Sequence, residues 1–182
     1  MSNKLFEYTR CIQKRMPKSV ILKKIIIRDL QPNNAWGLFI YNFRKEGQPW
    51  SHVSSRVQIS LDPRLIERGE YAFMRVLLHE VGHLYLKAIF FRNTKSFLDS
   101  DTEEFIVDSA ASTVTGNRRF LIHSQSYTTP LPFLGEKNPK NEKYRVLAMQ
   151  LTRELKQVYS DIKDIGYCPK EMTKNITHDY KE

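Results

Sequence analysis

The chain of 182 residues contains only two cysteines, Cys11 and Cys168, which lie far apart and form no CxxC pair. A small scaffold held together by disulfides needs more cysteines than this. We therefore expect two free thiols in a reducing compartment, and a single long-range disulfide stays open as the alternative.

Long apolar runs are also missing. The two most apolar stretches, 20–27 and 76–91, are interrupted by lysine, histidine and glutamate. Neither is expected to cross a membrane, because a spanning helix needs about 20 mainly apolar residues. Residues 1–16 lack the apolar core and the small-residue cleavage site of a secretory signal. These absences predict a cytoplasmic protein without a membrane partner.

No repeat or low-complexity segment is visible, and 41% hydrophobic with 27% charged residues is an ordinary globular composition. The length favours one domain that is large enough to bury a core. We expect this domain to cover residues 1–166. Residues 167–182 are expected to form a polar C-terminal tail, whose composition permits disorder.

Acidic residues are scarce in the first part of the chain. Residues 1–50 contain 10 lysines and arginines against 3 aspartates and glutamates, so much of the net charge of +9 lies there. Such a region could attract nucleic acid or an acidic protein partner. A solvated basic face is the simpler explanation, because no nucleic-acid-binding motif accompanies it.

The hydrophobic pattern predicts one helix, three strands and then three further helices. Helices are expected over 3–16, 69–91, 102–115 and 141–165, and strands over 20–30, 35–43 and 56–61. In the first helix, four side chains are expected to face the core: Leu5, Phe6, Ile12 and Met16. The alternation over 56–61 predicts a half-buried or edge strand. This order favours an α+β fold, with a small N-terminal sheet of about three strands packed on the helix over 69–91.

Polar residues interrupt that apolar helix in the pattern His79-Glu80-Val81-Gly82-His83. Residues four apart lie about one helical turn apart, so both imidazoles project from the same face. Two such nitrogens can bind one Zn²⁺, and the adjacent Glu80 can take a proton from a zinc-activated water. This HExxH pattern is typical of zinc metallopeptidases. It predicts one Zn²⁺ per chain, with His79 and His83 as ligands and Glu80 as general base.

A catalytic zinc needs a third protein ligand. No histidine follows His83 at the HExxHxxGxxH spacing, so the next predicted helix is the better source. Glu104 is favoured over Glu103, because Asp108 lies four residues later on the same helix face. Asp108 could then accept a hydrogen bond from the outer nitrogen of a zinc-binding histidine. Glu103 remains the alternative ligand, and capping of the helix is the alternative role for these acidic residues.

Small residues in both helices suggest close packing. Gly82 lies inside the predicted helix, where glycine costs about 1 kcal/mol relative to alanine. We expect it to allow the close approach of a neighbouring strand or of a substrate backbone. Ala110 and Ala111 would let the second helix pack tightly on the first.

The motif from His79 to His83, followed by Glu104-Phe105-Ile106-Val107-Asp108, resembles the gluzincin metallopeptidases. The small size resembles the minimal gluzincins, and the ImmA/IrrE-like peptidases are the nearest group. The resemblance covers roughly residues 56–115. It implies His79, His83 and Glu104 as zinc ligands, Glu80 as base and Asp108 as outer partner. It also implies that the strand over 56–61 binds substrate backbone by strand addition.

The predicted activity is therefore zinc-dependent hydrolysis of a peptide bond in a protein or peptide substrate. A residue that stabilises the oxyanion is also needed, and His123 and Tyr127 are the candidates, with Arg118 and Arg119 as others. Two other functions stay open. One is a basic nucleic-acid- or protein-binding module with a structural or inactive zinc site, and the other is a zinc hydrolase of a non-peptide amide.

Overall fold

The computed structural model describes residues 4–16, 20–33, 35–42, 55–93, 100–116 and 139–174. The elements in chain order are α1 (Lys4–Arg15), β1 (Val20–Ile27), the 3-10 helix η1 (Gln31–Asn33), β2 (Gly37–Asn42), β3 (Ser55–Leu61), α2 (Arg64–Glu67), α3 (Glu70–Asn93), α4 (Ser100–Thr115), α5 (Pro139–Ile165) and α6 (Pro169–Thr173). The expected α+β class is confirmed, and the sheet has three strands.

The sheet has the order β1-β3-β2, so β3 is its central strand. β3 pairs with β1 in parallel and with β2 in antiparallel orientation. Of the two alternatives for 56–61, a half-buried or an edge strand, the edge strand is therefore wrong. The alternation of Val57 and Ile59 with Gln58 shows which face of a strand is more buried, and it carries no information about how many neighbours the strand has.

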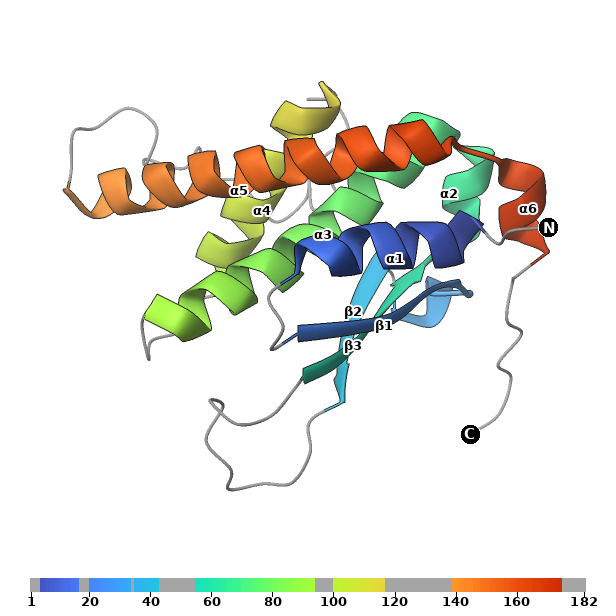
Figure 1. Ribbon diagram of the computed structural model, residues 1–182, viewed down its shortest axis with the longest axis horizontal. Helices are drawn as coiled ribbons and strands as arrows, with labels where there is room; N and C mark the ends of the chain where they lie inside the picture. Colours follow the sequence, from blue (N-terminus) through green and yellow to red (C-terminus); the bar gives the residue numbers. More distant parts are fainter. Residues whose placement is uncertain are drawn as a thin grey trace.

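The helices are layered on the sheet. α1 and α3 pack on the strands, and α5 lies across α1 and α3 on the side away from the sheet (Figure 1). α3 is buried on every side from Ala72 to Leu86, because the sheet, α4 and α5 all contact it. One hydrophobic core extends from Leu5 in α1 to Met172 in α6. The most deeply buried helix is thus the one that contains the histidine motif.

A buried aspartate joins three segments next to the sheet. The Asp62 carboxylate accepts hydrogen bonds from the backbone N–H groups of Leu30 and Arg64, at 3.0 Å and 2.9 Å, and from the Arg64 guanidinium at 2.6 Å. The Asp62 N–H donates to the Trp36 carbonyl at 2.9 Å. Asp62 therefore fixes the residues that follow β1, those that precede β2 and the start of α2.

Two expectations about the ends of the chain are wrong in part. Phe6 is 59% exposed, with the Arg10 guanidinium over its ring, whereas Leu5, Ile12 and Met16 are buried as expected. The segment after Ile165 continues the fold, because Tyr167 packs against the Phe73 ring and Met172 is fully buried. Residues 175–182 of the expected tail lie outside the described residues.

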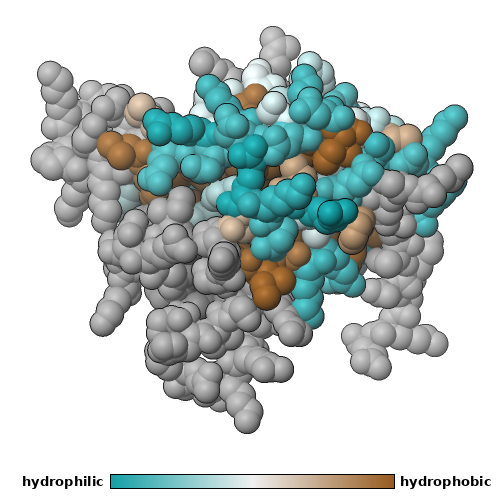
Figure 2. All heavy atoms as spheres, viewed as in Figure 1, coloured by the Kyte–Doolittle hydropathy of each residue, from teal (hydrophilic) through white to brown (hydrophobic). Residues whose placement is uncertain are grey.

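Hydrophilic residues cover most of the described surface on the face shown in Figure 2, and the hydrophobic patches between them are small. The described large hydrophobic side chains that are exposed are Phe6, Ile21, Tyr71, Val146 and Met149. Within the described ranges, no helix is long and apolar enough to cross a membrane.

The Asp62 contacts generate a stability prediction. Asp62→Asn keeps the shape of the side chain but removes the charge that the Arg64 guanidinium and two backbone N–H groups share. We expect a loss of about 1–3 kcal/mol in the free energy of unfolding, measured by urea denaturation. Asp164→Asn, at an exposed carboxylate of α5, is the control and should change the free energy of unfolding by less than about 0.5 kcal/mol. Equal losses in both variants would contradict the role of Asp62.

Candidate metal centre

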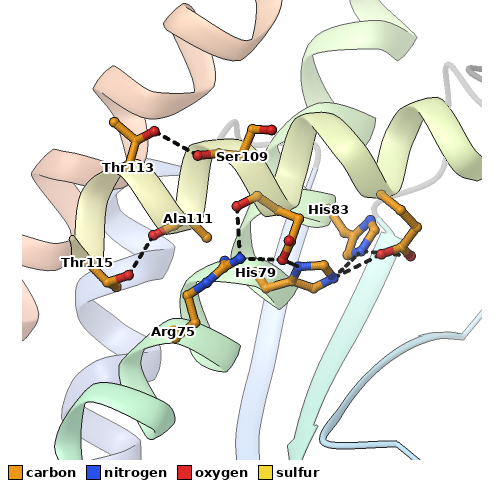
Figure 3. Close-up of polar contacts among 9 residues, drawn as sticks. Arg75, His79, His83, Ser109, Ala111, Thr113 and Thr115 are labelled. Carbon is orange, nitrogen blue, oxygen red and sulfur yellow. Dashed lines mark hydrogen bonds and ion pairs between the residues drawn. The ribbon is translucent and has the colours of Figure 1, made fainter. Parts of the chain in front are cut away.

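Two helices, α3 and α4, supply the polar cluster of the candidate site. His79 and His83 project from successive turns of α3 toward α4, which crosses over it (Figure 3). Their Nε2 atoms are 3.0 Å apart. The Glu104 carboxylate of α4 lies beside both: Oε2 is 3.1 Å from His79 Nε2, and Oε1 is 3.3 Å from His83 Nε2. One ligand atom from each of the three residues lies within 4.8 Å of the others, so this group can hold a metal ion.

The close crossing of the two helices depends on Gly82. A Cβ atom built on Gly82 would lie 2.8 Å from Cγ1 of Val107 in α4, closer than real Cβ contacts allow. The glycine was expected to face a strand or a substrate, but its neighbour is this helix. Ala110 and Ala111 of α4 are buried, as the expected tight packing requires. Small side chains thus bring α4 near enough for its carboxylates to reach the imidazoles.

Each histidine has a carboxylate at its outer nitrogen. Asp108 Oδ1 lies 3.4 Å from His79 Nδ1, and Glu103 Oε1 lies 2.6 Å from His83 Nδ1. A carboxylate at Nδ1 favours the tautomer that carries its proton there, which leaves Nε2 free to bind a metal. Glu103, expected only as an alternative ligand, therefore lies on the outer side of His83. Glu104 faces both Nε2 atoms.

Arg75 is the residue that the sequence analysis missed. It lies one turn before His79 on α3, is fully buried, and forms an ion pair with the Asp108 carboxylate. The same Nη2 atom donates to the Asp108 backbone carbonyl at 2.9 Å. The signal was present in the sequence, since Arg75, His79 and His83 continue one polar stripe at four-residue spacing along an apolar helix.

The carboxylates change the protonation of the histidines. Burial lowers the pKa of His83, but hydrogen bonds from its ring to Glu103 and Glu104 outweigh this and raise the pKa to about 10. The pKa of His79 is also raised, since hydrogen bonds to Asp108 and Glu104 outweigh burial. The pKa of Glu104 is lowered, because contacts with both histidines outweigh its own desolvation. The described cluster thus has an excess of negative charge that protons or a cation can balance.

Glu80 lies on the other side of His79, toward the sheet. Its side chain is buried, and its carboxylate lies against Gly37, the first residue of β2. Burial raises the pKa of the Glu80 carboxyl, and the two histidines act in the opposite direction. A raised pKa makes the Glu80 carboxylate a better proton acceptor than an exposed glutamate.

The expected oxyanion-stabilising residues, His123 and Tyr127, lie outside the described residues, as do Arg118 and Arg119. The other two histidines, His52 and His178, also lie outside them. The assignments of His123 and Tyr127 therefore stay predictions.

Comparison of the chain with protein-family models, curated proteins and solved structures finds no match. The resemblance to the gluzincins thus depends on the motif residues and their arrangement alone. The geometry has two imidazoles and one carboxylate around a common point, with further carboxylates at both outer nitrogens. This donor set fits the His₂Glu pattern of catalytic zinc sites.

The buried ion pair between Arg75 and Asp108 generates a prediction about metal affinity. In Arg75→Met, Asp108 loses its guanidinium partner and holds His79 Nδ1 less firmly. We expect zinc affinity, measured by competition with a chromophoric chelator, to fall by about 10–100-fold. Arg153→Met removes an exposed arginine from α5 and should leave the affinity unchanged. Wild-type affinity in Arg75→Met would contradict this role for Arg75.

The raised pKa of His83 generates a prediction about pH. The pKa of His83 in the metal-free protein is about 10, against an ordinary value of 6.5, so its ring stays protonated at neutral pH. This proton stabilises the metal-free fold fully below pH 6.5, and the contribution is lost as the pH rises through 10. A metal must displace it, so metal affinity should rise by about tenfold per pH unit for each proton displaced.

Calorimetry of zinc binding at pH 7.5 in two buffers of different ionisation enthalpy measures the proton release. We expect at least one proton per bound metal, and fewer in Glu103→Gln, which lacks the carboxylate at His83 Nδ1. Binding without proton release would contradict the protonated state of His83.

Proposed function

We propose that the chain binds one Zn²⁺ through His79, His83 and Glu104 and hydrolyses peptide bonds, as a metallopeptidase of gluzincin type. The observation that carries this proposal is the convergence of His79 Nε2, His83 Nε2 and a Glu104 carboxylate oxygen within 4.8 Å. A second carboxylate, that of Glu80, is buried and lies outside this group of three.

The residues of the chain have separate tasks in this proposal. Glu104 and the two histidines hold the ion, and Asp108 and Glu103 keep the imidazoles in the tautomer that ligation needs. When bound, zinc activates water at neutral pH and polarises a carbonyl group. Glu80 accepts the proton that is released when water attacks and then delivers it to the leaving amine.

The buried carboxylate of Glu80 favours a catalytic metal site over a structural one. A structural zinc is normally surrounded by four protein ligands and needs no base. Among the described residues the ligand group has three members, and an additional carboxylate is kept buried at a cost in desolvation. Asp108 is also buried, but it pairs with Arg75 and His79. The Glu80 carboxylate lies instead against Gly37, where proton transfer would give it a role.

The strand that could bind a substrate differs from the one expected. β3 is paired on both sides and cannot accept another strand. β2 lies at one side of the sheet, and its first residue, Gly37, touches the Glu80 carboxylate. We infer that an extended peptide pairs with β2, because among the described strands β2 has one partner, and the other edge of such a strand can accept strand addition.

Metal analysis of purified protein tests this proposal. We expect about one zinc per chain in the wild type and a loss of zinc in both His79→Ala and Glu104→Ala, since each variant removes one of three ligands. Glu80→Gln should retain zinc and lose at least about 100-fold in the rate of cleavage of an unfolded protein substrate such as casein.

The outcomes separate the parts of the proposal. Zinc retained in Glu104→Ala would place the third ligand elsewhere. Cleavage that survives in Glu80→Gln would contradict the assignment of Glu80 as the general base. Wild-type protein that binds zinc but cleaves no peptide would leave the metal site standing and contradict the peptidase activity.

A further inference from the structure

Gly37 has no conformational reason to be glycine. The described glycines with a positive φ are Gly69, Gly116 and Gly166, whereas Gly37 has a backbone conformation that other residues adopt. It is the first residue of β2 and pairs with Leu61 of β3. Glycine also weakens a strand, because it adds entropy to the unfolded chain and has no side chain to pack. Another constraint must account for it.

That constraint is the Glu80 carboxylate. A Cβ atom built on Gly37 would overlap Oε1 of Glu80 and lie 2.8 Å from both its Cγ and its Cδ. Real Cβ atoms essentially never come this close to other heavy atoms, so any larger residue at position 37 has to displace the carboxylate or the strand. The space that Glu80 occupies exists because residue 37 has no side chain.

The strand has little freedom to move away. The Trp36 carbonyl accepts a hydrogen bond from the Asp62 N–H at 2.9 Å. The Trp36 ring has the Arg64 guanidinium 4.4 Å and the Arg68 guanidinium 4.3 Å from its centre. These contacts fix the backbone on one side of Gly37, and pairing with β3 fixes the other.

Glu80 has little freedom as well. It is one residue from His79 on a helix that is buried on every side, and its own side chain is buried. A displaced carboxylate would therefore have to take another side-chain conformation, which changes its position relative to the two imidazoles. A shift of about 1 Å in a catalytic group can cost on the order of 100-fold in rate.

We propose that Gly37 is a positioning residue, whose missing side chain creates the space that holds the Glu80 carboxylate beside the metal centre. The role of Glu80 as the base depends on the proposed peptidase function. The contact between residue 37 and Glu80 does not depend on it, so the two are tested separately.

The contact is tested on metal-free protein without substrate, in four proteins: wild type, Gly37→Ala, Glu80→Ala and the double variant. Gly37→Ala should lower the urea midpoint of unfolding in the wild-type background, because the new Cβ meets the carboxylate. In the Glu80→Ala background the same substitution should lower it little or raise it. If Gly37→Ala alone does not fold, the double variant should fold.

Equal losses of stability in both backgrounds, or a double variant that also fails to fold, would overturn the proposal. A selectively ¹³C-carboxyl-labelled glutamate sample gives a second measurement. The Glu80 resonance, identified by its absence in Glu80→Ala, should shift in Gly37→Ala, while the other glutamate resonances keep their positions. An unchanged Glu80 resonance would contradict the contact.

The effect on catalysis is tested on zinc-loaded protein. Gly37→Ala should retain one zinc per chain and lose about 10–100-fold in kcat with little change in KM, since the base moves and the ligands do not. In the Glu80→Gln background it should cause no further loss. A further loss there, or a lost zinc ion, would mean that Gly37 acts through another residue. If the wild type cleaves nothing, the peptidase function fails, and the metal-free experiments still decide on the contact.

Discussion

The close crossing of α3 and α4 is the constraint on which the candidate site depends. Gly82 lets the Val107 side chain lie closer to α3 than a Cβ atom at position 82 would allow. At this separation a carboxylate of α4 reaches both imidazoles of α3, and further carboxylates reach their outer nitrogens. A larger separation would leave two histidines on a buried helix without partners, and buried polar groups without partners are costly.

Charge is the second feature that connects the fold to the proposed function. The described cluster contains four carboxylates, those of Glu80, Glu103, Glu104 and Asp108, against one permanent cation, Arg75. Carboxylates gathered in a buried place repel each other unless protons or a cation intervene. The pKa of both histidines is raised, which favours protons on their rings in the metal-free protein. A divalent cation would replace those protons and bind the same nitrogens.

The parts of this site that follow a local rule could be predicted from the sequence. The one-turn spacing of His79 and His83 is a property of any helix, and the α+β class followed from the order of the elements. The place of β3 between two strands, the pairing of Arg75 with Asp108 and the contact of Gly37 with Glu80 depend on which elements meet in space. A hydrophobic pattern indicates which faces of a helix or strand are buried. It does not indicate which other element packs against them.

The central claim is that His79, His83 and Glu104 are the ligands of one zinc ion. X-ray absorption at the zinc edge of the purified wild-type protein tests it most directly, because it identifies the ligand atoms without a substrate. We expect two imidazole nitrogens at about 2.0–2.1 Å, with the remaining scatterers oxygen at about 2.0–2.2 Å. Sulfur at about 2.3 Å, which only Cys11, Cys168 or a methionine could supply, or a shell without imidazole, would contradict it.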